Sequence, residues 1–397
     1  MPDVGIQSAI RQLVVITGAQ PYDDAASPNA LDLQLDAALR QGFAHVLIIA
    51  PTACEAITVR YAHRRIGNAH VDVLAAPGVH GTRSLLAHAR DHLADSIVLI
   101  SDAAFVDANI RAVEQRLRTD AALSAVIGHP AGQGEGTGEG GIVALRMAAL
   151  DRIGDDGGSV AADIAALAKD GGITTMALNG YYRDLRFPDA PALLHADRAG
   201  RKRPVLFLDR DGVLNVDHAY VSRIDAWEWM PGAIELIRAA NDHGIAVVIV
   251  TNQSGIARGY YSEPDLWRLH HHVQQMLYAH GAFVDAIHYS PDHADAADPA
   301  YRIAAPLGRK PSPAMLLRAL RQHDLDPDAA LMVGDQPSDM AAAAAIGIPA
   351  VQFHGGRLDD AVFASPSWRS LLTRARQWMR APSPDSIREL SDASAHD

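Results

Sequence analysis

Cysteine is nearly absent from this chain of 397 residues, and the absence excludes whole classes of structure. The single cysteine, Cys54, rules out an internal disulfide bond and any metal site built from several thiolates. No apolar run approaches the roughly 20 residues needed to cross a bilayer. The beginning of the chain carries an early acid and an apolar run too short for a signal peptide. We therefore expect a cytoplasmic protein with no membrane partner.

Positive charge is also scarce, since 35 lysines and arginines face 47 acids and leave a formal net charge of −12. This balance disfavours nucleic acid or an anionic membrane surface as the main partner. A small phosphorylated substrate stays compatible, because it needs only a local cationic pocket made from a few residues and a metal ion. The glycine-rich stretch 128–141 lacks the lysine-serine ending of a phosphate-binding loop, so we interpret it as flexible.

Apolar, β-branched runs alternate with helical patterns along the chain, which predicts an α/β fold with parallel strands. The length favours two domains, and the proline- and charge-rich stretch 187–204 is the best boundary. We expect domains at 1–190 and 204–380, joined by a linker at 191–203. Residues 381–397, rich in Ser, Pro and Asp, predict a disordered tail.

Several expected strands of the second half end in polar residues: Asp209 and Asp211 after the first, Thr251 after the second, and Asp335 after the fourth. In an open parallel sheet these strand ends meet in one crevice, which Lys310 can also reach. Clustered carboxylates repel one another unless a cation lies among them, and a hard ion such as Mg²⁺ suits oxygen ligands. One carboxylate can then attack phosphorus while another transfers protons.

Simpler interpretations exist for each piece of this pattern. An Asp-Gly pair after a strand is usually a turn, a Gly-Asp pair before a helix is usually an N-cap, and a lone lysine usually lies on the surface. The ordered set of all the pieces together favours the chemical interpretation.

The same residues carry a family resemblance. "DRDGV", the threonine of "VVIVTNQSG", the lysine of "GRKPSP", and "GDQPSD" match in order the four motifs of the haloacid dehalogenase-like phosphohydrolases. The flanks "FLDRDGVLNVDHAYV", "TNQSGIARGYYSE" and "RKPSPAMLL" resemble the branch of D-glycero-D-manno-heptose 1,7-bisphosphate phosphatases and histidinol-phosphatases. The resemblance covers about residues 204–378 and implies a parallel sheet that hydrolyses a small sugar phosphate.

The resemblance also implies roles. Asp209 corresponds to the nucleophile and Asp211 to the general acid/base, while Thr251 corresponds to a hydrogen-bonding partner of the phosphoryl group and Lys310 to its charge-balancing lysine. The implied Mg²⁺ ligands are Asp209, the backbone carbonyl of Asp211, and Asp335.

Further roles are implied around this centre. Asp339 corresponds to a residue that supports the metal site or orients Lys310. Asn252, Arg258 and Arg309 are the candidate contacts for the rest of the substrate, with Arg258 equally readable as an ordinary loop arginine.

The spacing of the motifs indicates an open site, and one feature of the relatives is missing. Only 40 positions separate Asp211 from Thr251, which leaves no room for a cap domain between them. Close relatives carry a cysteine-based zinc loop, whereas residues 288–313 contain no cysteine. His288 and His293 alone do not make a closed structural zinc site, so we expect no zinc and a differently folded loop. The three histidines at 270–272 predict a solvated helix face rather than a ligand set.

The first half resembles sugar-1-phosphate nucleotidyltransferases with a mixed sheet, on "GVHGTRSLLAHARDHLADSIVLISDAAFVD", "GIVALRMAALDRI" and "GYYRDLRFPDAPALLHA". By this resemblance Asp102 and Asp184 stand where the family holds its metal ions. The equivalent of the catalytic loop has no lysine or arginine between Arg11 and Arg40, and Asp23 with Asp24 would repel a nucleoside triphosphate. We therefore expect a degenerate transferase fold.

Three hypotheses for function follow. The first is a Mg²⁺-dependent phosphatase of a small sugar phosphate. The second is a bifunctional enzyme that also makes a nucleoside-diphosphate sugar. The third is a phosphatase whose first half is a non-catalytic interaction module, which forms a homo-oligomer, binds a sugar phosphate or covers the open phosphatase site.

Overall fold

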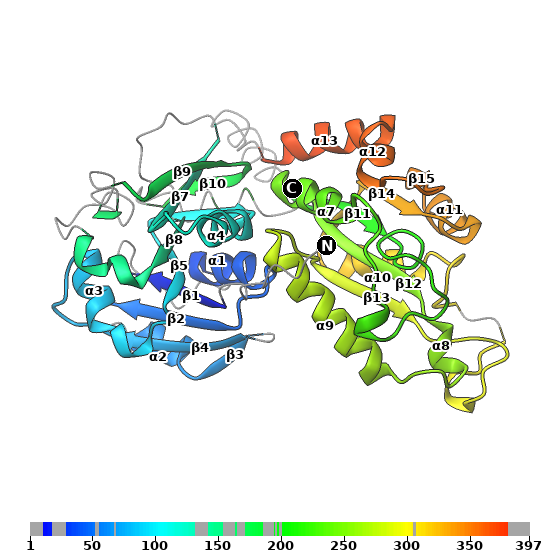
Figure 1. Ribbon diagram of the computed structural model, residues 1–397, viewed down its shortest axis with the longest axis horizontal. Coiled ribbons are helices and arrows are strands. Elements are labelled where there is room, and N and C mark those ends of the chain that lie inside the picture. Colours follow the sequence, from blue (N-terminus) through cyan, green and yellow to red (C-terminus); the bar gives the residue numbers. More distant parts are fainter. Residues whose placement is uncertain are drawn as a thin grey trace, which may run out of the picture.

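The computed structural model describes residues 11–17, 29–51, 55–66, 69–131, 142–153, 163–164, 171–185, 194, 197, 201–304 and 307–379. These residues form two halves that lie side by side, one before and one after the boundary near residue 200 (Figure 1). The expected tail 381–397, most of the linker 191–203 and most of the loop 128–141 lie outside the described residues.

The N-terminal half is built on a mixed sheet of eight strands in the order β3-β4-β2-β1-β5-β8-β7-β9. Its strands are β1 (Gln12–Ile16), β2 (His45–Ala50), β3 (Arg64–Ile66), β4 (Ala69–Ala75), β5 (Ser96–Ser101), β7 (Ala125–Pro130), β8 (Ile142–Arg146) and β9 (Ile173–Leu178). Strands β4, β2, β1 and β5 run parallel, whereas β3 and β8 run antiparallel to their neighbours. This confirms the mixed sheet that the resemblance implied.

A small antiparallel sheet and several helices complete this half. The small sheet pairs β6 (Ala104–Ala108) with β10 (Gly180–Asp184). The helices are α1 (Ala30–Leu39), α2 (Glu55–Tyr61), α3 (Thr82–His88) and α4 (Ile110–Thr119). Apolar clusters fill both faces of the large sheet, which is why the central strands are apolar throughout.

The C-terminal half is a five-stranded parallel sheet in the order β13-β12-β11-β14-β15. Its strands are β11 (Arg203–Leu208), β12 (Ala246–Asn252), β13 (Ala286–Ser290), β14 (Leu325–Gly334) and β15 (Ala350–Gln352). Its helices are α7 (Ala233–Asp242), α8 (Ser254–Ala257), α9 (Glu263–Ala279), α10 (Ala314–Gln322), α11 (Pro337–Ala344), α12 (Leu358–Phe363) and α13 (Pro366–Met379). Core clusters lie on both faces of the sheet. The fold class expected from the sequence is therefore confirmed.

The two halves meet where α4 lies against the end of α9 (Figure 1). The guanidinium of Arg111 lies between the rings of Phe43 and Tyr278, 4.0 and 4.6 Å from their centroids, and pairs with Glu114 at 3.2 Å. Gly42 leaves room for Tyr278, because a Cβ atom there would lie 2.1 Å from the ring. The contact is thus closely packed and contains a fully buried cation.

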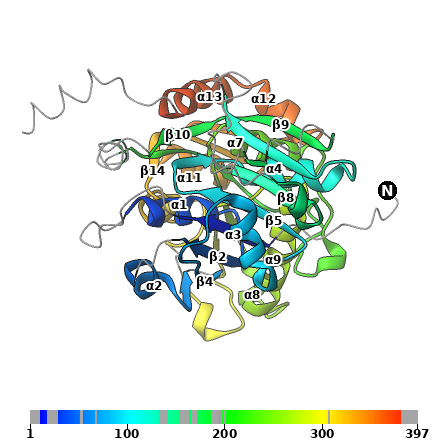
Figure 2. The same cartoon turned by 90° about the vertical axis from the view of Figure 1, so that its left-hand side faces the viewer.

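Polar contacts extend this interface along the amino ends of the C-terminal strands. Asn109 Nδ2 donates to Asp242 Oδ1 at 2.6 Å and to the Gly281 carbonyl at 2.9 Å. Arg40 Nε lies 3.7 Å from Asp285 Oδ1. Asp242 and Asp285 come just before β12 and β13, so the N-terminal half packs at the amino ends of the parallel strands. Figure 2 gives the view onto the N-terminal half.

Within the described residues, none of the helices combines the length and the apolar character that a membrane crossing requires.

Candidate active site

Strand β11 ends in a tight turn that positions two carboxylates. The Asp209 amide donates to the Val333 carbonyl on β14 at 2.9 Å, so Asp209 is anchored at the end of the sheet. Gly212 has a φ of +80°, and a Cβ atom there would lie 2.5 Å from Asp335 Oδ2. A glycine is therefore required both by the left-handed backbone and by the close approach of Asp335.

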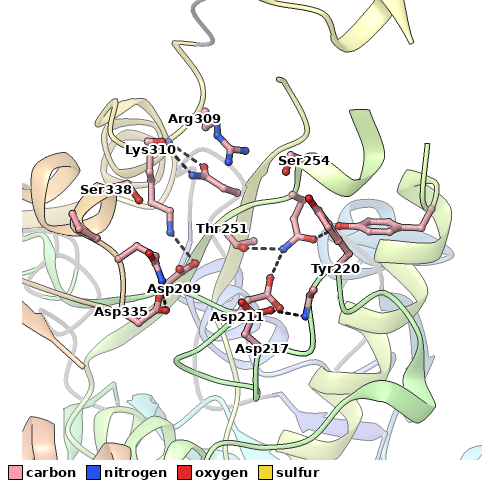
Figure 3. Close-up of a pocket in the computed structure, with 16 residues that line it drawn as sticks. Asp209, Asp211, Asp217, Tyr220, Thr251, Ser254, Arg309, Lys310, Asp335 and Ser338 are labelled. Atoms are coloured by element: carbon pink, nitrogen blue, oxygen red, sulfur yellow. Dashed lines mark hydrogen bonds and ion pairs between the residues drawn. The ribbon is translucent and has the colours of Figure 1, made fainter. Parts of the chain in front are cut away.

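Acidic residues from two separate segments, one after β11 and one that runs from the end of β14 into α11, meet beyond the carboxyl ends of the strands. Asp209, Asp335 and Asp339 each offer an oxygen atom within 4.8 Å of the others. Lys310 Nζ lies 2.8 Å from Asp209 Oδ1 (Figure 3). It also lies 2.6 Å from Asp339 Oδ1 and donates to the Val250 carbonyl at 2.8 Å. One buried lysine thus joins two of the three carboxylates.

Burial and charge act against each other in this cluster. Burial raises the pKa of Asp209 to about 6, while the neighbouring Lys310 opposes the rise. Burial lowers the pKa of Lys310, but Asp209 and Asp339 outweigh it and raise that pKa overall. Lys310 is therefore protonated near neutral pH and offsets the charge of the two carboxylates.

The residues fit a divalent cation. Asp335 Oδ1 is buried without a hydrogen-bond partner, and burial raises the pKa of this carboxyl group. Its other oxygen accepts a hydrogen bond from Gln336 Nε2 at 2.6 Å. A hard ion such as Mg²⁺ prefers oxygen ligands such as carboxylates. The Asp335 oxygen that lacks a hydrogen bond is free to bind such an ion. Asp339 is occupied differently, because its oxygens contact Lys310 and the Gln336 amide at 3.0 Å.

Asp211 points away from the cation cluster and is held by three side chains. Arg210 Nη2 lies 2.8 Å from both carboxylate oxygens, Gln253 Nε2 donates to Oδ2 at 2.9 Å, and Asn215 Nδ2 donates to Oδ1 at 3.0 Å. Arg210 is fully buried. The sequence reasoning selected none of these three residues, although each fixes the orientation of the expected acid/base.

Gln253 connects the two sides of the site. Its Nε2 donates to Thr251 Oγ1 at 2.9 Å as well as to Asp211, and its Oε1 accepts from the Tyr261 hydroxyl at 2.5 Å. Thr251 lies between Asp209 and Asp211 in Figure 3. A signal was present in the sequence, because Gln253 follows Thr251 by two positions and residues so spaced on extended chain share one face.

His270 corrects the expectation of a solvated histidine run. His270 is buried, with Nε2 3.5 Å from Arg210 Nη1, and burial lowers its pKa to about 3. The prediction was wrong for this residue because α9 turns by 3.6 residues, so one of three consecutive side chains joins the buried stripe of Leu266, Leu269 and Val273. His271 is exposed.

These residues line a pocket of about 540 Å³. Its lining includes the catalytic candidates, Asn252, Arg309 and the segment from Asp217 to Tyr220, and all of its lining residues belong to the C-terminal half. Residues 211–251 are all described and form a loop, a short 3₁₀ turn, α7 and β12, so no cap domain is inserted there. The suggestion that the N-terminal half covers the phosphatase site is wrong for the described residues. That half packs at the amino ends of the parallel strands, whereas the pocket lies at their carboxyl ends.

Two arginines, of which Arg309 lines the pocket, have a guanidinium nitrogen without a hydrogen-bond partner among the described residues. Arg309 lines the pocket, and its Nη1 is buried without a hydrogen bond, as is Nε of Arg258. Burial and the charge of Arg258 lower the pKa of Arg309. Arg258 Nη2 also lies 3.3 Å from His293 Nε2. Among the described residues, no carboxylate forms an ion pair with either arginine, so an anion would satisfy both.

Asn252 has a second role besides facing the pocket. Its amide forms two hydrogen bonds with the backbone of Lys310, from Nδ2 to the carbonyl oxygen and from the Lys310 amide to Oδ1, each 3.1 Å long. The expected substrate contact is therefore also the side chain that holds the lysine segment in place.

Hydrogen bonds hold the described part of the segment in which we expected no zinc site. The His293 amide donates to the Tyr301 carbonyl at 3.1 Å, and the Tyr301 hydroxyl donates to Glu263 at 3.1 Å. His288 faces a different neighbour, since its ring lies 5.8 Å from that of His323. The two histidines considered for zinc thus have separate surroundings.

In the N-terminal half, Asp102 precedes β6 by two residues, and Asp184 is the last residue of the strand β10 that pairs with β6. Asp102 is buried after β5, and Asp184 pairs with Ala104 at the end of the small sheet. Asp23 and Asp24, which we expected to repel a nucleoside triphosphate, lie outside the described residues.

Comparisons with known proteins agree with this geometry. The family model of haloacid dehalogenase-like hydrolases matches residues 144–347, just over half of the chain. The D-glycero-beta-D-manno-heptose-1,7-bisphosphate 7-phosphatase of Rhodopseudomonas palustris is 41% identical over 158 residues, which cover 40% of this chain and 87% of that protein. The D-glycero-alpha-D-manno-heptose-1,7-bisphosphate 7-phosphatase of Burkholderia mallei is 41% identical over 147 residues, 37% of this chain and 77% of that protein.

A solved structure with a likeness to the N-terminal half is a putative glucose-1-phosphate thymidylyltransferase from Bacillus anthracis. The two chains are 12% identical, the match covers 47% of this chain and 94% of that one, and the TM-score is 0.39. A likeness at this level says nothing about activity.

Proposed function

Because this chain belongs to the haloacid dehalogenase-like hydrolase family and is a phosphoric monoester hydrolase, we propose that it hydrolyses a small sugar phosphate with the help of Mg²⁺. The observation that carries the proposal is the contact of one buried lysine, Lys310, with both Asp209 and Asp339, beside the unsatisfied Asp335. Asp209 and Asp335, with the backbone carbonyl of Asp211, would hold the ion. When bound, Mg²⁺ supplies charge neutralisation for an incoming phosphate.

Asp209 is the proposed nucleophile. Its anchored backbone presents a carboxylate oxygen at the pocket, and Lys310 favours the ionised form that attack requires. Attack on phosphorus forms an aspartyl-phosphate on Asp209 and releases the sugar alkoxide. Thr251, buried between the two aspartates, offers a hydroxyl to the transferred group.

Asp211 is the proposed proton carrier for both halves of the reaction. It would protonate the leaving sugar oxygen and then take a proton from the water that hydrolyses the aspartyl-phosphate. Arg210 and Gln253 fix the carboxylate of Asp211, which lines the pocket. A group used twice in this way benefits from a fixed orientation, because geometry limits proton transfer as strongly as acidity does.

The substrate we propose carries a second anionic group, as a heptose bisphosphate does. Arg309 lines the pocket and its charge interacts with that of Arg258, and both have unsatisfied guanidinium nitrogens, so an anion would relieve their mutual repulsion. Relatives named for the alpha and the beta anomer are equally identical to this chain, so the comparison favours neither anomer.

The test combines one variant with a substrate panel. Asp209→Asn should lower kcat at least about a thousandfold with an unchanged fold, while Asp225→Asn, an exposed acid outside the pocket, should leave it unchanged. Acid-quenched reactions with radiolabelled substrate should trap a phosphoenzyme in the parent and none in Asp209→Asn. Undiminished turnover by Asp209→Asn would sink the assignment.

The substrate panel contains both anomers of heptose 1,7-bisphosphate, their monophosphates and histidinol phosphate. Arg309→Gln should raise KM for the bisphosphates about tenfold and change KM for the monophosphates little. An equal rise for both classes would show that Arg309 does not contact a second anion.

The bifunctional hypothesis and the interaction-module hypothesis concern the N-terminal half. Absence of pyrophosphate release with every nucleoside triphosphate and heptose 1-phosphate would count against the first. The buried Arg111 contact favours the second, because it makes this half a fixed support of the phosphatase half. A homo-oligomer through the N-terminal half stays a prediction.

A further inference from the structure

A second cluster of potential metal ligands lies on the edge of the N-terminal sheet, far from the pocket in sequence and fold. Strand β3 is the outermost strand, and it pairs antiparallel with β4 through Arg64–Val71 and Arg65–His70 (Figure 1). His63 lies in the turn just before β3, and its ring contacts Asp72 of β4. His70 and Asp72 are two residues apart on one strand, so they share a face of the sheet.

The distances within this cluster match a coordination site. His63 Nδ1 and His70 Nε2 each lie 3.2 Å from Asp72 Oδ1, and the three groups offer ligand atoms within 4.8 Å of one another. In a tetrahedral site with bonds of about 2.0–2.1 Å, neighbouring donor atoms are about 3.3 Å apart. Closing the remaining separation needs only rotation of two exposed imidazoles.

Ion pairing alone accounts poorly for the arrangement. The side chain of His63 is 86% exposed and that of His70 49% exposed, and exposed pairs of this kind contribute little to stability. Both rings nevertheless converge on the same carboxylate oxygen, His63 from the turn before β3 and His70 from β4. A shared cation explains why all three donors approach one point.

We propose that His63, His70 and Asp72 bind a divalent transition-metal ion of the Zn²⁺ class. Two imidazole nitrogens and one carboxylate oxygen are ligands that Zn²⁺ accepts, and water would fill the open position. Mg²⁺ prefers oxygen ligands alone, so this site and the carboxylate cluster of the pocket select different ions. The ion would tie the edge strand β3 to β4 and block its free edge.

The positive charge of Arg65 is expected to weaken the binding of a metal ion at this site. Arg65 is the register partner of His70, so its positive charge lies beside the site. We expect Arg65→Ala to tighten metal binding, because it removes a repulsive charge without touching a ligand.

The experiment is a Zn²⁺ titration of the full chain by calorimetry, in excess Mg²⁺ to occupy the carboxylate cluster. One equivalent should bind, and His63→Ala, His70→Ala and Asp72→Asn should each weaken it at least about tenfold. His88→Ala, which removes an exposed histidine of α3, is the matched control and should bind as the parent does. Visible absorption of Co²⁺ in place of Zn²⁺ should report a four-coordinate site.

Two outcomes would overturn the proposal. The first is the absence of Zn²⁺ binding to the parent. The second is binding that all three ligand variants retain, which would place the ion elsewhere, for example at Cys54 or the carboxylate cluster. Phosphatase activity in Mg²⁺ should be the same in all variants, so this test does not depend on the function proposed for the pocket.

Discussion

Gln253 holds two groups that the reaction uses, although nothing about a lone glutamine marks it as important. One amide nitrogen donates both to Asp211 and to Thr251, and the Tyr261 hydroxyl holds the opposite end of the side chain. Because Gln253 is buried, removing its amide would take this partner from the hydroxyls of Thr251 and Tyr261. It would also leave Asp211 held by Arg210 and Asn215 alone.

Gln253→Leu should therefore lower kcat about ten- to hundredfold and change KM less than about twofold, since it alters the orientation of Asp211 rather than substrate binding. Tyr261→Phe removes only the hydroxyl behind Gln253 and should show a smaller loss of kcat. Steady-state kinetics with the best substrate of the panel measures both variants. A raised KM with unchanged kcat would mean that Gln253 contacts the substrate instead.

His288 predicts how the C-terminal half responds to acid. Burial lowers the pKa of His288 to about 4, with His323 acting in the same direction. The unfolded chain, with an ordinary pKa near about 6.5, then binds more protons than the folded chain. The stability from the neutral ring is present above about pH 6.5 and is lost as the pH falls toward about 4.

His288→Phe should remove this part of the pH dependence. Between about pH 7 and about pH 5, the free energy of unfolding should fall by about 1 kcal/mol less in the variant, after allowance for the ring's partial exposure. Urea unfolding followed by tryptophan fluorescence measures it. His271→Phe, at an exposed position of α9, should keep the parent's slope, and identical slopes in parent and His288→Phe would contradict the prediction.

The sequence alone identified functional residues where a charged side chain directly follows an apolar strand. Asp209, Asp211 and Asp335 follow apolar strands, where carboxylates need an explanation, and the parallel pattern predicted that they meet. Arg210 and His270 were missed because their contacts depend on how α9 packs on the sheet, which spacing alone does not indicate. Whether Asp339 serves the ion or Lys310 also required coordinates, which place it against the lysine.

At the scale of elements, apolar runs predicted the strands well because both faces of each sheet are covered. Strand direction was less readable: β8 runs against β5 and β7, although its run "IVALR" is as apolar as the parallel strands. Direction depends on the connection that delivers a strand, and the connection before β8 shows no periodic pattern. The turn after β11 was readable, since Asp-Gly predicts a left-handed residue.

Gly212→Ala tests that turn as an element of the site. A Cβ atom would add strain at φ +80° and would lie 2.5 Å from Asp335 Oδ2, so Asp335 must move. We expect kcat/KM to fall at least about tenfold, the Mg²⁺ concentration for half activity to rise, and stability to fall by about 1–2 kcal/mol.

Gly347→Ala is the matched control for this variant. Gly347 has a φ of +75°, and a Cβ atom there would have nothing within 4 Å. It should show a similar loss of stability with unchanged Mg²⁺ dependence. Equal kinetic effects in the two variants would mean that the contact with Asp335 is irrelevant.

At the scale of the whole molecule, the pocket and the N-terminal half lie at opposite ends of the C-terminal strands. The pocket occupies the carboxyl ends of the C-terminal strands, and the N-terminal half occupies the amino ends, through Arg111, Tyr278 and Asn109. The described contacts therefore favour a structural role for the N-terminal half, which stabilises the C-terminal half at the amino ends of its strands. The sequence predicted two domains but not this arrangement, because an interface residue such as Tyr278 looks like any other core position of a helix.

A chain that begins at Arg201 tests this division of labour. It should keep phosphatase chemistry, since all lining residues of the pocket are present, but it exposes Tyr278, which is buried against Gly42 and Arg111 in the full chain. Loss of this burial costs about 1.5–3 kcal/mol and should lower the unfolding temperature by several degrees. All five tryptophans lie after residue 201, so their fluorescence reports the same half in both chains.

Tyr278→Gln separates lost support from damage by truncation. In the full chain it removes a packed ring from the interface and should destabilise the C-terminal half. In the shortened chain the same change replaces an exposed aromatic ring by a polar side chain, so it should raise solubility and leave the unfolding temperature unchanged or higher. Opposite signs in the two chains are expected only where the N-terminal half covers this surface. Equal unfolding temperatures for the full and shortened chains would contradict this prediction. They would show that the interface with the N-terminal half does not stabilise the C-terminal half.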